Sequence, residues 1–233
     1  MRVTNLHSWK VSPKRAAKIQ QVLRSKISCE PPLKMPRLVA GADVSYNKFC
    51  PELYASVVVI DLAHMETVEE RGVAAKANFP YIPGLLSFRE VPPLLRIFRR
   101  LRTKPEALVC DGQGLAHPRR FGLACHLGLL LDIPTLGCAK SRLIGEYHEP
   151  GRARGQFSPL MDGGEVIGSV LRTRSGTQPV FVSVGHRISL AMARELVLLL
   201  TPRFRLPETT RRSHMLVNRL RRSFMEAASL TGA

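Results

Sequence analysis

The chain has few acidic residues and few aromatic rings. Its 233 residues include 18 Asp and Glu against 35 Lys and Arg, so the formal net charge is +17, and aromatic residues make up only 6%. A strongly basic surface attracts polyanions, among which nucleic acid is the commonest partner. The alternative interpretation is that the basic surface merely keeps the protein soluble. Acidic membrane lipid is a less favoured partner than nucleic acid, because no basic amphipathic segment carries Trp or Phe along one face.

Long hydrophobic runs are absent. Residues 1–21 contain no apolar stretch of the length that a signal peptide needs. The most apolar region, residues 122–139, is interrupted by His126, Asp132 and Pro134, so it does not resemble a membrane span. We therefore expect a cytoplasmic protein with no membrane partner.

Common motifs for nucleotides, zinc and serine hydrolysis are missing as well. The five cysteines form no C-x-x-C pair and have no zinc-type spacing, so reduced thiols are expected. The segment DGQGLAHPRRFG lacks the third glycine of a dinucleotide loop, and the chain has no G-K-[ST], G-x-S-x-G or H-E-x-x-H. These absences argue against hydride transfer, phosphoryl transfer from a nucleotide and serine hydrolysis.

The hydrophobic pattern predicts three strands followed by alternating helices and strands. The β-rich segments 36–46, 53–62 and 66–77 are separated by short loops, which indicates an antiparallel meander. Apolar residues then recur at helical spacing from Val91 to Leu101. Short buried strands at 106–111 and 134–139 flank a buried helix at 121–132. This order predicts one α/β domain over residues 1–233, with a ribonuclease-H-like mixed central sheet flanked by helices.

The remaining elements are less regular. Residues 165–173 and 179–185 are expected to pair as a late hairpin, and further helices are expected at 13–28, 188–200 and 209–228. The segment 146–165 is expected to be an irregular insertion, too short to be a domain linker.

Two aspartates stand inside or at the end of predicted strands. Asp43 follows the small residues of AGA in the first strand, and Asp111 closes EALVC and opens a glycine loop. The carboxyl ends of strands in an open α/β sheet are where ligands bind. Each aspartate alone could equally be a turn or cap residue. Two on adjacent central strands are more telling, because a divalent cation takes oxygen ligands from more than one element.

Glu90 and His214 are locally ambiguous. Ser87-Phe88-Arg89-Glu90 matches a capping box ahead of an apolar run. However, the prolines at 92 and 93 fit best in a first turn, which would start the helix later and leave Glu90 before it. His214 on the last predicted helix has Asn218 and Arg221 as same-face neighbours, and a surface histidine is the simpler local interpretation.

The stretch NFPYIPGLLSFRE is stiff. Pro80 and Pro83 each fix φ near −65° and lack an N–H, so they hold Tyr81 and Ile82 in a loop that does not suit a sheet interior. Local reasoning leaves two interpretations, an ordinary packed turn or a rigid apolar wedge.

Five blocks, VAGADVSY, PYIPGLLSFRE, DGQGLAHPRRFG, PTLGCAKSRL and ETTRRSH, together resemble the endonuclease V family. They occur in the family's order over nearly the whole chain. The resemblance implies a ribonuclease-H-like fold and a DNA repair nuclease directed at deoxyinosine, the product of adenine deamination. It also implies hydrolysis of the second phosphodiester 3′ to the lesion, which leaves 3′-hydroxyl and 5′-phosphate ends.

The resemblance further implies the roles of individual residues. Asp43 and Asp111 would hold Mg²⁺, for which Mn²⁺ is expected to substitute, Glu90 would complete the acidic site, and His214 would stand beside it. The catalytic role implied for Glu90 is compatible with a capping hydrogen bond.

Substrate contacts are implied in the same way. Pro80, Tyr81, Ile82 and Pro83 would form the wedge, with Tyr81 stacking where the base had been. The extruded base would lie in a pocket with two kinds of wall: backbone at Gly84, Leu86 and Gly122, and apolar side chains at Leu123 and Leu143. His117 and Lys140 would contact phosphates, with Arg119 and Arg120 as helpers.

The expected partner is deoxyinosine-containing DNA bound by a monomer. Inosine-containing RNA is the alternative substrate, because some relatives prefer it. A basic nucleic-acid-binding domain without catalysis is the other alternative, but it predicts a missing carboxylate, and Asp43, Glu90 and Asp111 are all present.

Overall fold

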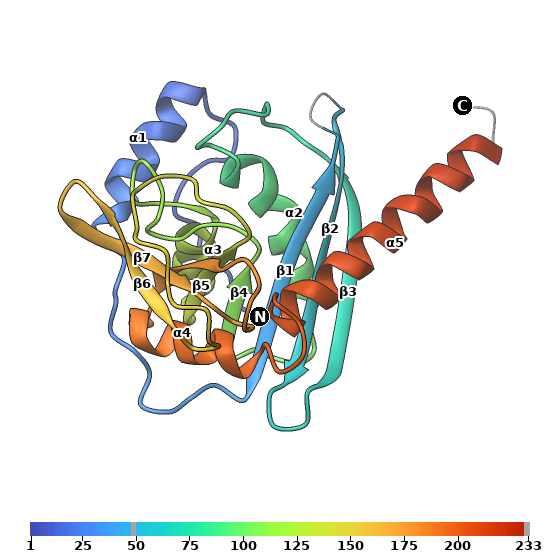
Figure 1. Ribbon diagram of the computed structural model, residues 1–233. Helices are drawn as coiled ribbons and strands as arrows, with labels where there is room; N and C mark the ends of the chain where they lie inside the picture. The colour runs from blue at the N-terminus through green and yellow to red at the C-terminus, as the bar shows by residue number, and fades with distance from the viewer. Residues whose placement is uncertain (48–49, 231–233) are drawn as a thin grey trace.

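An eight-stranded sheet forms the centre of the molecule (Figure 1). The computed structural model describes residues 1–47 and 50–230. The strands are β1 (Leu38–Tyr46), β2 (Glu52–Asp61), β3 (Glu66–Lys76), β4 (Ala107–Cys110), β5 (Thr135–Ala139), β6 (Phe157–Asp162), β7 (Glu165–Leu171) and β8 (Val180–His186). Their order across the sheet is β3-β2-β1-β4-β5-β8-β7-β6. One sheet thus joins strands from residue 38 to residue 186. The single domain over 1–233 stays a prediction.

The sheet is mixed, as predicted. Strands β1, β2 and β3 form the expected antiparallel meander. Strand β4 lies parallel to β1 on one side and to β5 on the other. The late hairpin of β7 and β8 is also confirmed, and β8 runs antiparallel to β5.

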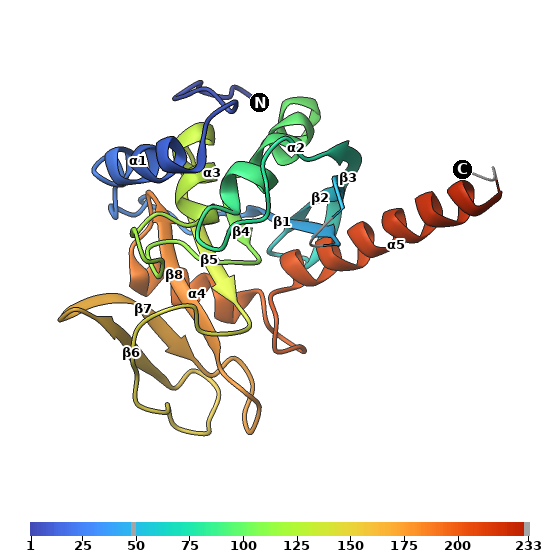
Figure 2. The same cartoon turned by 90° about the horizontal axis from the view of Figure 1, so that it is seen from above.

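Helices cover both faces of the sheet (Figure 2). Helices α2 (Ser87–Arg100) and α3 (Leu123–Leu131) lie on one face, and α1 (Pro13–Arg24) packs against that layer. Helices α4 (Leu190–Leu199) and α5 (Glu208–Leu230) lie on the other face. None of the helices in the described part of the chain is long and apolar enough to cross a membrane.

Central strands are buried on both faces. In β4, Leu108 packs in the core below α2 and α3, whereas Val109 packs in the core below α4. In β1, Ala40 packs in the core below α2 and α3, and Val39 packs in the core below α4. Because both faces of these strands are buried, their sequences are continuous apolar runs and do not alternate between apolar and polar residues.

Helix α5 approaches β1 very closely. A Cβ built on Gly41 of β1 would lie 2.2 Å from the carbonyl carbon of Thr209, so only glycine permits the contact. Beyond this contact, the Ser56 and Ser213 hydroxyls lie 2.7 Å apart and tie α5 to β2. The far end of α5 extends away from the body (Figure 1). The close approach matters because His214 follows within the next turn of the helix.

The structure corrects two predictions of local structure. Helix α2 begins at Ser87, so the later start suggested by the prolines is wrong. Backbone bonds from Phe88 to Leu85 and from Arg89 to Leu86 form its first turn, and the buried Phe88 ring anchors it. Segment 146–165 is also not irregular throughout, because it contains β6, a strand at the sheet edge whose glycine-rich surroundings concealed it.

Candidate active site

Asp43 and Asp111 meet because β1 and β4 are parallel neighbours. The register pairs Ala42 with Cys110, and each aspartate is the next residue along its strand. Both carboxylates therefore emerge at the same point of the sheet, where β4 ends. The topology thus brings together an acid inside β1 and an acid that directly follows β4.

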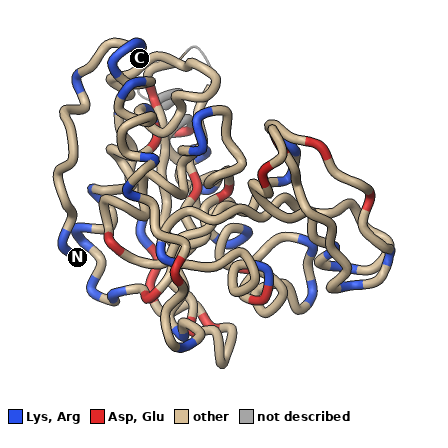
Figure 3. Tube along the Cα trace, turned by 90° about the vertical axis from the view of Figure 1, so that its left-hand side faces the viewer, with Lys and Arg blue, Asp and Glu red and all other residues tan. Residues whose placement is uncertain are grey.

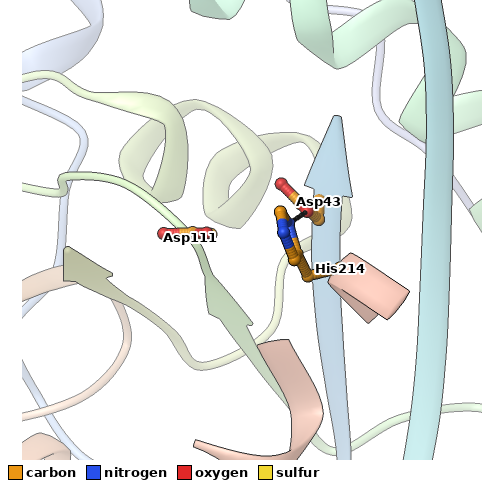
Figure 4. A group of neighbouring side chains, drawn as sticks. All are labelled: Asp43, Asp111 and His214. Atoms are coloured by element: carbon orange, nitrogen blue, oxygen red, sulfur yellow. Dashed lines mark hydrogen bonds and ion pairs between the residues drawn. The ribbon is translucent and has the colours of Figure 1, made fainter. Parts of the chain in front are cut away.

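His214 of α5 joins this pair (Figure 4). One ligand atom from each of Asp43, Asp111 and His214 lies within 4.8 Å of the others. The His214 Nδ1 is 2.7 Å from Asp43 Oδ2, and its Nε2 is 2.9 Å from the Asn218 amide nitrogen. Asp43 Oδ1 also accepts the Val44 N–H at 2.8 Å. Asp43 is thus held through both of its oxygens.

Asp111 has a cationic partner on the next strand. The Lys140 Nζ lies 2.6 Å from Asp111 Oδ2, and Lys140 directly follows β5. The lysine side chain is 43% exposed, so its ammonium group remains accessible to an anion from solvent. Lys140 and Asp111 line the same cavity.

The electrostatics of the pair suit a cation. Burial raises the pKa of Asp43, the nearby Asp111 raises it further, and the hydrogen bond from His214 opposes the shift. A divalent cation bound between the two carboxylates would relieve this cost. Carboxylate oxygens are the donors that Mg²⁺ prefers, so the donor set fits such an ion.

Glu90 lies near the pair but outside the cluster of three. Its Oε1 accepts a 2.6 Å hydrogen bond from the Tyr46 hydroxyl. Burial raises the pKa of Glu90 to about 7, although the Tyr46 bond works in the opposite direction. The nearby Asp43 contributes to the upward shift, which shows that the acids act on one another.

The capping-box interpretation of Glu90 is wrong. Residue Leu86 precedes α2, and no side chain caps that end of the helix. The Ser87 hydroxyl lies 3.0 Å from His126 Nδ1, while the Glu90 carboxylate points to Tyr46. Glu90 is therefore available to the acidic site.

A cavity of about 410 Å³ adjoins the acids. Its wall includes Glu90 and Asp111. It is also lined by every residue assigned to the base pocket from the sequence, namely Gly84, Leu86, Gly122, Leu123 and Leu143. Two of the three acids thus line the same cavity as the residues expected to hold a base.

The proline loop forms the rim of this cavity. Tyr81 and Pro83 line it, Pro80 is exposed, and Ile82 is half-buried against the core that contains Phe88. The Tyr81 ring meets the Tyr46 ring edge-on, with centroids 6.1 Å apart. Only part of the loop is packed, so its tip remains available for contact.

His117 is buried and has internal partners. Its Nδ1 accepts the Arg119 N–H at 3.2 Å, and its Nε2 donates to the Gly84 carbonyl at 3.0 Å. Burial lowers its pKa to about 4. Arg120 likewise pairs with Asp162 at 2.7 Å. Phosphate contacts by these side chains stay predictions, and His117 would have to release one partner to make one.

Sequence reasoning missed Tyr46 as a site residue. It lies three residues beyond Asp43, at the end of β1, and nothing in its local pattern distinguishes it from an ordinary strand tyrosine. Asn218 was noticed only as a same-face neighbour of His214, and the structure confirms that contact.

A family model, a curated relative and a crystal structure carry the same description. The model of the Endonuclease V family matches residues 21–215. The endonuclease V of Myxococcus xanthus is 47% identical over 224 residues, which cover 95% of each chain. The crystal structure of endonuclease V from Streptomyces avermitilis superposes with a TM-score of 0.88 at 43% identity, covering 98% of this chain and 100% of that one.

A relative that was solved in complex with DNA has the same fold at lower sequence identity. Ciona intestinalis endonuclease V, solved with a 24-mer DNA containing an inosine followed by a ribo-adenosine, has a TM-score of 0.80 and 26% identity, covering 91% of this chain and 98% of that one. The fold and the family expected from the five sequence blocks are confirmed. The chain belongs to the endonuclease V family of nucleases.

Proposed function

We propose that this protein is a repair nuclease for deoxyinosine in DNA. It hydrolyses the second phosphodiester bond 3′ to the lesion and leaves 3′-hydroxyl and 5′-phosphate ends. The observation that carries the proposal is the shared wall of the 410 Å³ cavity, where Asp111 and Glu90 stand beside the pocket residues. The DNA in the Ciona relative's complex, which contains an inosine, supports the choice of substrate.

Mg²⁺ is the proposed cofactor, and Mn²⁺ would substitute for it. Asp43 and Asp111 would hold the ion, with Glu90 completing the acidic set. When bound, the ion would supply an activated water and would offset charge on the scissile phosphate. The clustering of Asp43, Asp111 and His214 within 4.8 Å supports this assignment.

Protein side chains organise the same centre. His214 holds one oxygen of Asp43, which keeps that carboxylate directed at the cluster. Lys140 keeps a half-exposed ammonium group beside Asp111, where it can contact a backbone phosphate. Both side chains would align substrate and ligands before any bond is broken.

The cavity would receive the extruded hypoxanthine. Leu123 and Leu143 supply apolar walls, and in the described part of the chain the Leu86 N–H has no hydrogen-bond acceptor. That free donor suits the 6-oxo group of the base. Flipping costs less for a poorly paired base, and a stiff Pro80–Pro83 tip with Tyr81 at its centre would fill the space left behind.

Charge supports a nucleic-acid partner. Lys and Arg lie on most parts of the trace in Figure 3, and Asp and Glu are fewer. The net charge of +17 would bring the polyanion to the site over long distances. All the site residues come from one chain, which supports action as a monomer.

A cleavage assay tests the proposal. Inosine-bearing DNA and RNA, each with Mg²⁺ or with EDTA, should separate substrate preference from metal dependence on one gel, and a sequencing ladder locates the cut. We expect cleavage of inosine DNA only with the metal ion, at the second bond 3′ to inosine. Cleavage of RNA alone, or cleavage in EDTA, would refute the proposal.

Two variants belong in the same assay. Asp43→Asn and Asp111→Asn should each lose cleavage but keep binding, because the pocket is separate from the ion ligands. Asp132→Asn is the matched control, because this exposed residue adopts the left-handed conformation that Asn tolerates. Full activity of either site variant would refute the metal assignment.

A further inference from the structure

Gln20 of α1 is a buried amide whose polar atoms are all engaged. Its side chain is 1% exposed. The Nε2 donates to the Gly84 carbonyl and to the Phe121 carbonyl, at 3.1 Å each. The Oε1 accepts from Arg119 Nε at 2.6 Å. The residue lies just outside the span 21–215 that the family model matches.

Its two acceptors belong to two segments that build the cavity wall. Gly84 lines the cavity and lies in the loop that follows the proline tip, and Phe121 directly precedes Gly122, which lines the cavity and caps α3. Gln20 itself also lines the cavity. One NH₂ group thus holds side by side two backbone segments that are distant in sequence.

The Gly84 carbonyl has three donors in all. Besides Gln20, it accepts from His117 Nε2 at 3.0 Å and from Arg119 Nη2 at 2.5 Å. Gly84 has a φ of +77°, a conformation that a glycine adopts without strain. Three convergent donors fix the direction of this carbonyl more firmly than the single partner that a buried group requires.

We propose that Gln20 is the positioning residue that fixes the backbone wall of the base pocket. This proposal rests on the proposed function, since the pocket must be one that reads a base. The amide holds the Gly84 loop against the segment that leads into Gly122, so it fixes the backbone groups that would contact the base. Gln20 makes no hydrogen bond to Asp43, Asp111 or His214, so it acts on recognition of the base and not on the bond-breaking step.

Gln20→Glu is the discriminating variant. It keeps the shape of the side chain and an oxygen for Arg119, but it turns a second oxygen toward two carbonyl oxygens. Gln21→Glu is the matched control, because Gln21 is exposed and receives the same chemical change. Each protein is measured for its melting temperature, kcat, KM and fluorescence-anisotropy binding. The binding probes are duplexes that carry one inosine, one abasic site or no lesion.

We expect Gln20→Glu to lower the preference for the inosine duplex over the undamaged duplex by about 10-fold, because the backbone groups that contact the base are no longer held in place. KM should rise, kcat at saturating substrate should stay unchanged, and binding to abasic and undamaged duplexes should not change. Gln21→Glu should match the wild type in every measurement.

Other outcomes overturn the inference. An unchanged inosine preference in folded Gln20→Glu does so, and so does an equal loss on all three duplexes, which would indicate a purely structural residue. If Gln20→Glu does not fold, Gln20→Met, which removes the amide but keeps the length, replaces it. Failure of both to fold also makes the role structural. A wild type without any inosine preference refutes the proposed function instead, and the two failures are therefore distinguishable.

Discussion

The imidazole of His214 lies 2.7 Å from Asp43, although 171 positions separate the two residues in the chain. The Asn218 amide donates to the far ring nitrogen, so the near nitrogen, Nδ1, carries the proton and donates it to the carboxylate. The contact exists only because Gly41 lets α5 approach β1. The contact orients the Asp43 carboxylate within the cluster that it forms with Asp111 and His214.

The first prediction concerns this contact. His214→Ala should lower the cleavage rate by about 10- to 100-fold, the usual cost of removing a group that orients a metal ligand. The concentration of Mg²⁺ needed for half-maximal activity should rise as well. Both quantities come from a magnesium titration of single-turnover cleavage.

Asn218→Ala is the control for His214. It removes the partner of the far ring nitrogen but leaves the bond to Asp43, so its loss should be clearly smaller. Equal magnesium titration curves for His214→Ala and the wild type would show that the contact does not tune the metal site.

The second prediction concerns Glu90 and pH. Burial raises its folded-state pKa from 4.5 to about 7, so the neutral acid is favoured in the fold. Its contribution to stability is then complete below pH 4.5 and is lost as the pH rises through 7. In EDTA, Glu90→Gln should therefore melt at a higher temperature than the wild type at pH 8, and the difference should vanish toward pH 4.5.

Magnesium should change this comparison. An ion that binds the ionised Glu90 carboxylate of the wild type stabilises the folded protein, and the variant lacks that carboxylate. At pH 8, Mg²⁺ should therefore raise the melting temperature of the wild type more than that of the variant. Thermal melts of both proteins and of the exposed control Glu66→Gln, with and without Mg²⁺, check the prediction. A Glu90→Gln protein that melts below the wild type at pH 8 in EDTA would contradict it.

The third prediction concerns the proline loop. Tyr81→Ala should reduce the ratio of inosine to adenine duplex binding, because base stacking on an aromatic ring contributes about 1–3 kcal/mol. Tyr81→Phe keeps the ring and should retain the ratio. Competition binding with both duplexes measures this ratio. If Tyr81→Ala discriminates between the inosine and adenine duplexes as well as the wild type does, the result would count against the wedge.

Much of the fold was predictable because its signals are local. The meander of β1 to β3 and the helix from Val91 onward follow from strand-rich runs and helical spacing. The edge strand β6 was missed because a partly exposed strand with a proline inside it gives a weak pattern. The start of α2 was misjudged because burial of Phe88, a tertiary effect, outweighed the preference of proline for a first turn.

The site was predictable only in part, for a related reason. The sequence shows Asp43 in the first strand and Asp111 just after a later one, and the parallel register of β1 and β4 then brings them together. The hydrogen bond from Tyr46 to Glu90 and the bond from the Gln20 amide to Gly84 depend on contacts between distant segments. No spacing rule describes such contacts, so only the folded structure reveals them.

The last prediction tests how α5 is placed. A methyl group at Gly41 would collide with backbone atoms of Thr209, which cannot rotate away as a flexible side chain can. Gly41→Ala should therefore push α5 off β1, lower the melting temperature and move His214 away from Asp43. Cleavage should fall at least as far as in His214→Ala, while binding of the inosine duplex should change less, because the pocket lies on the other side of the acids. Normal cleavage by a folded Gly41→Ala protein would show that the helix can shift without cost, and that the close approach does not control the site.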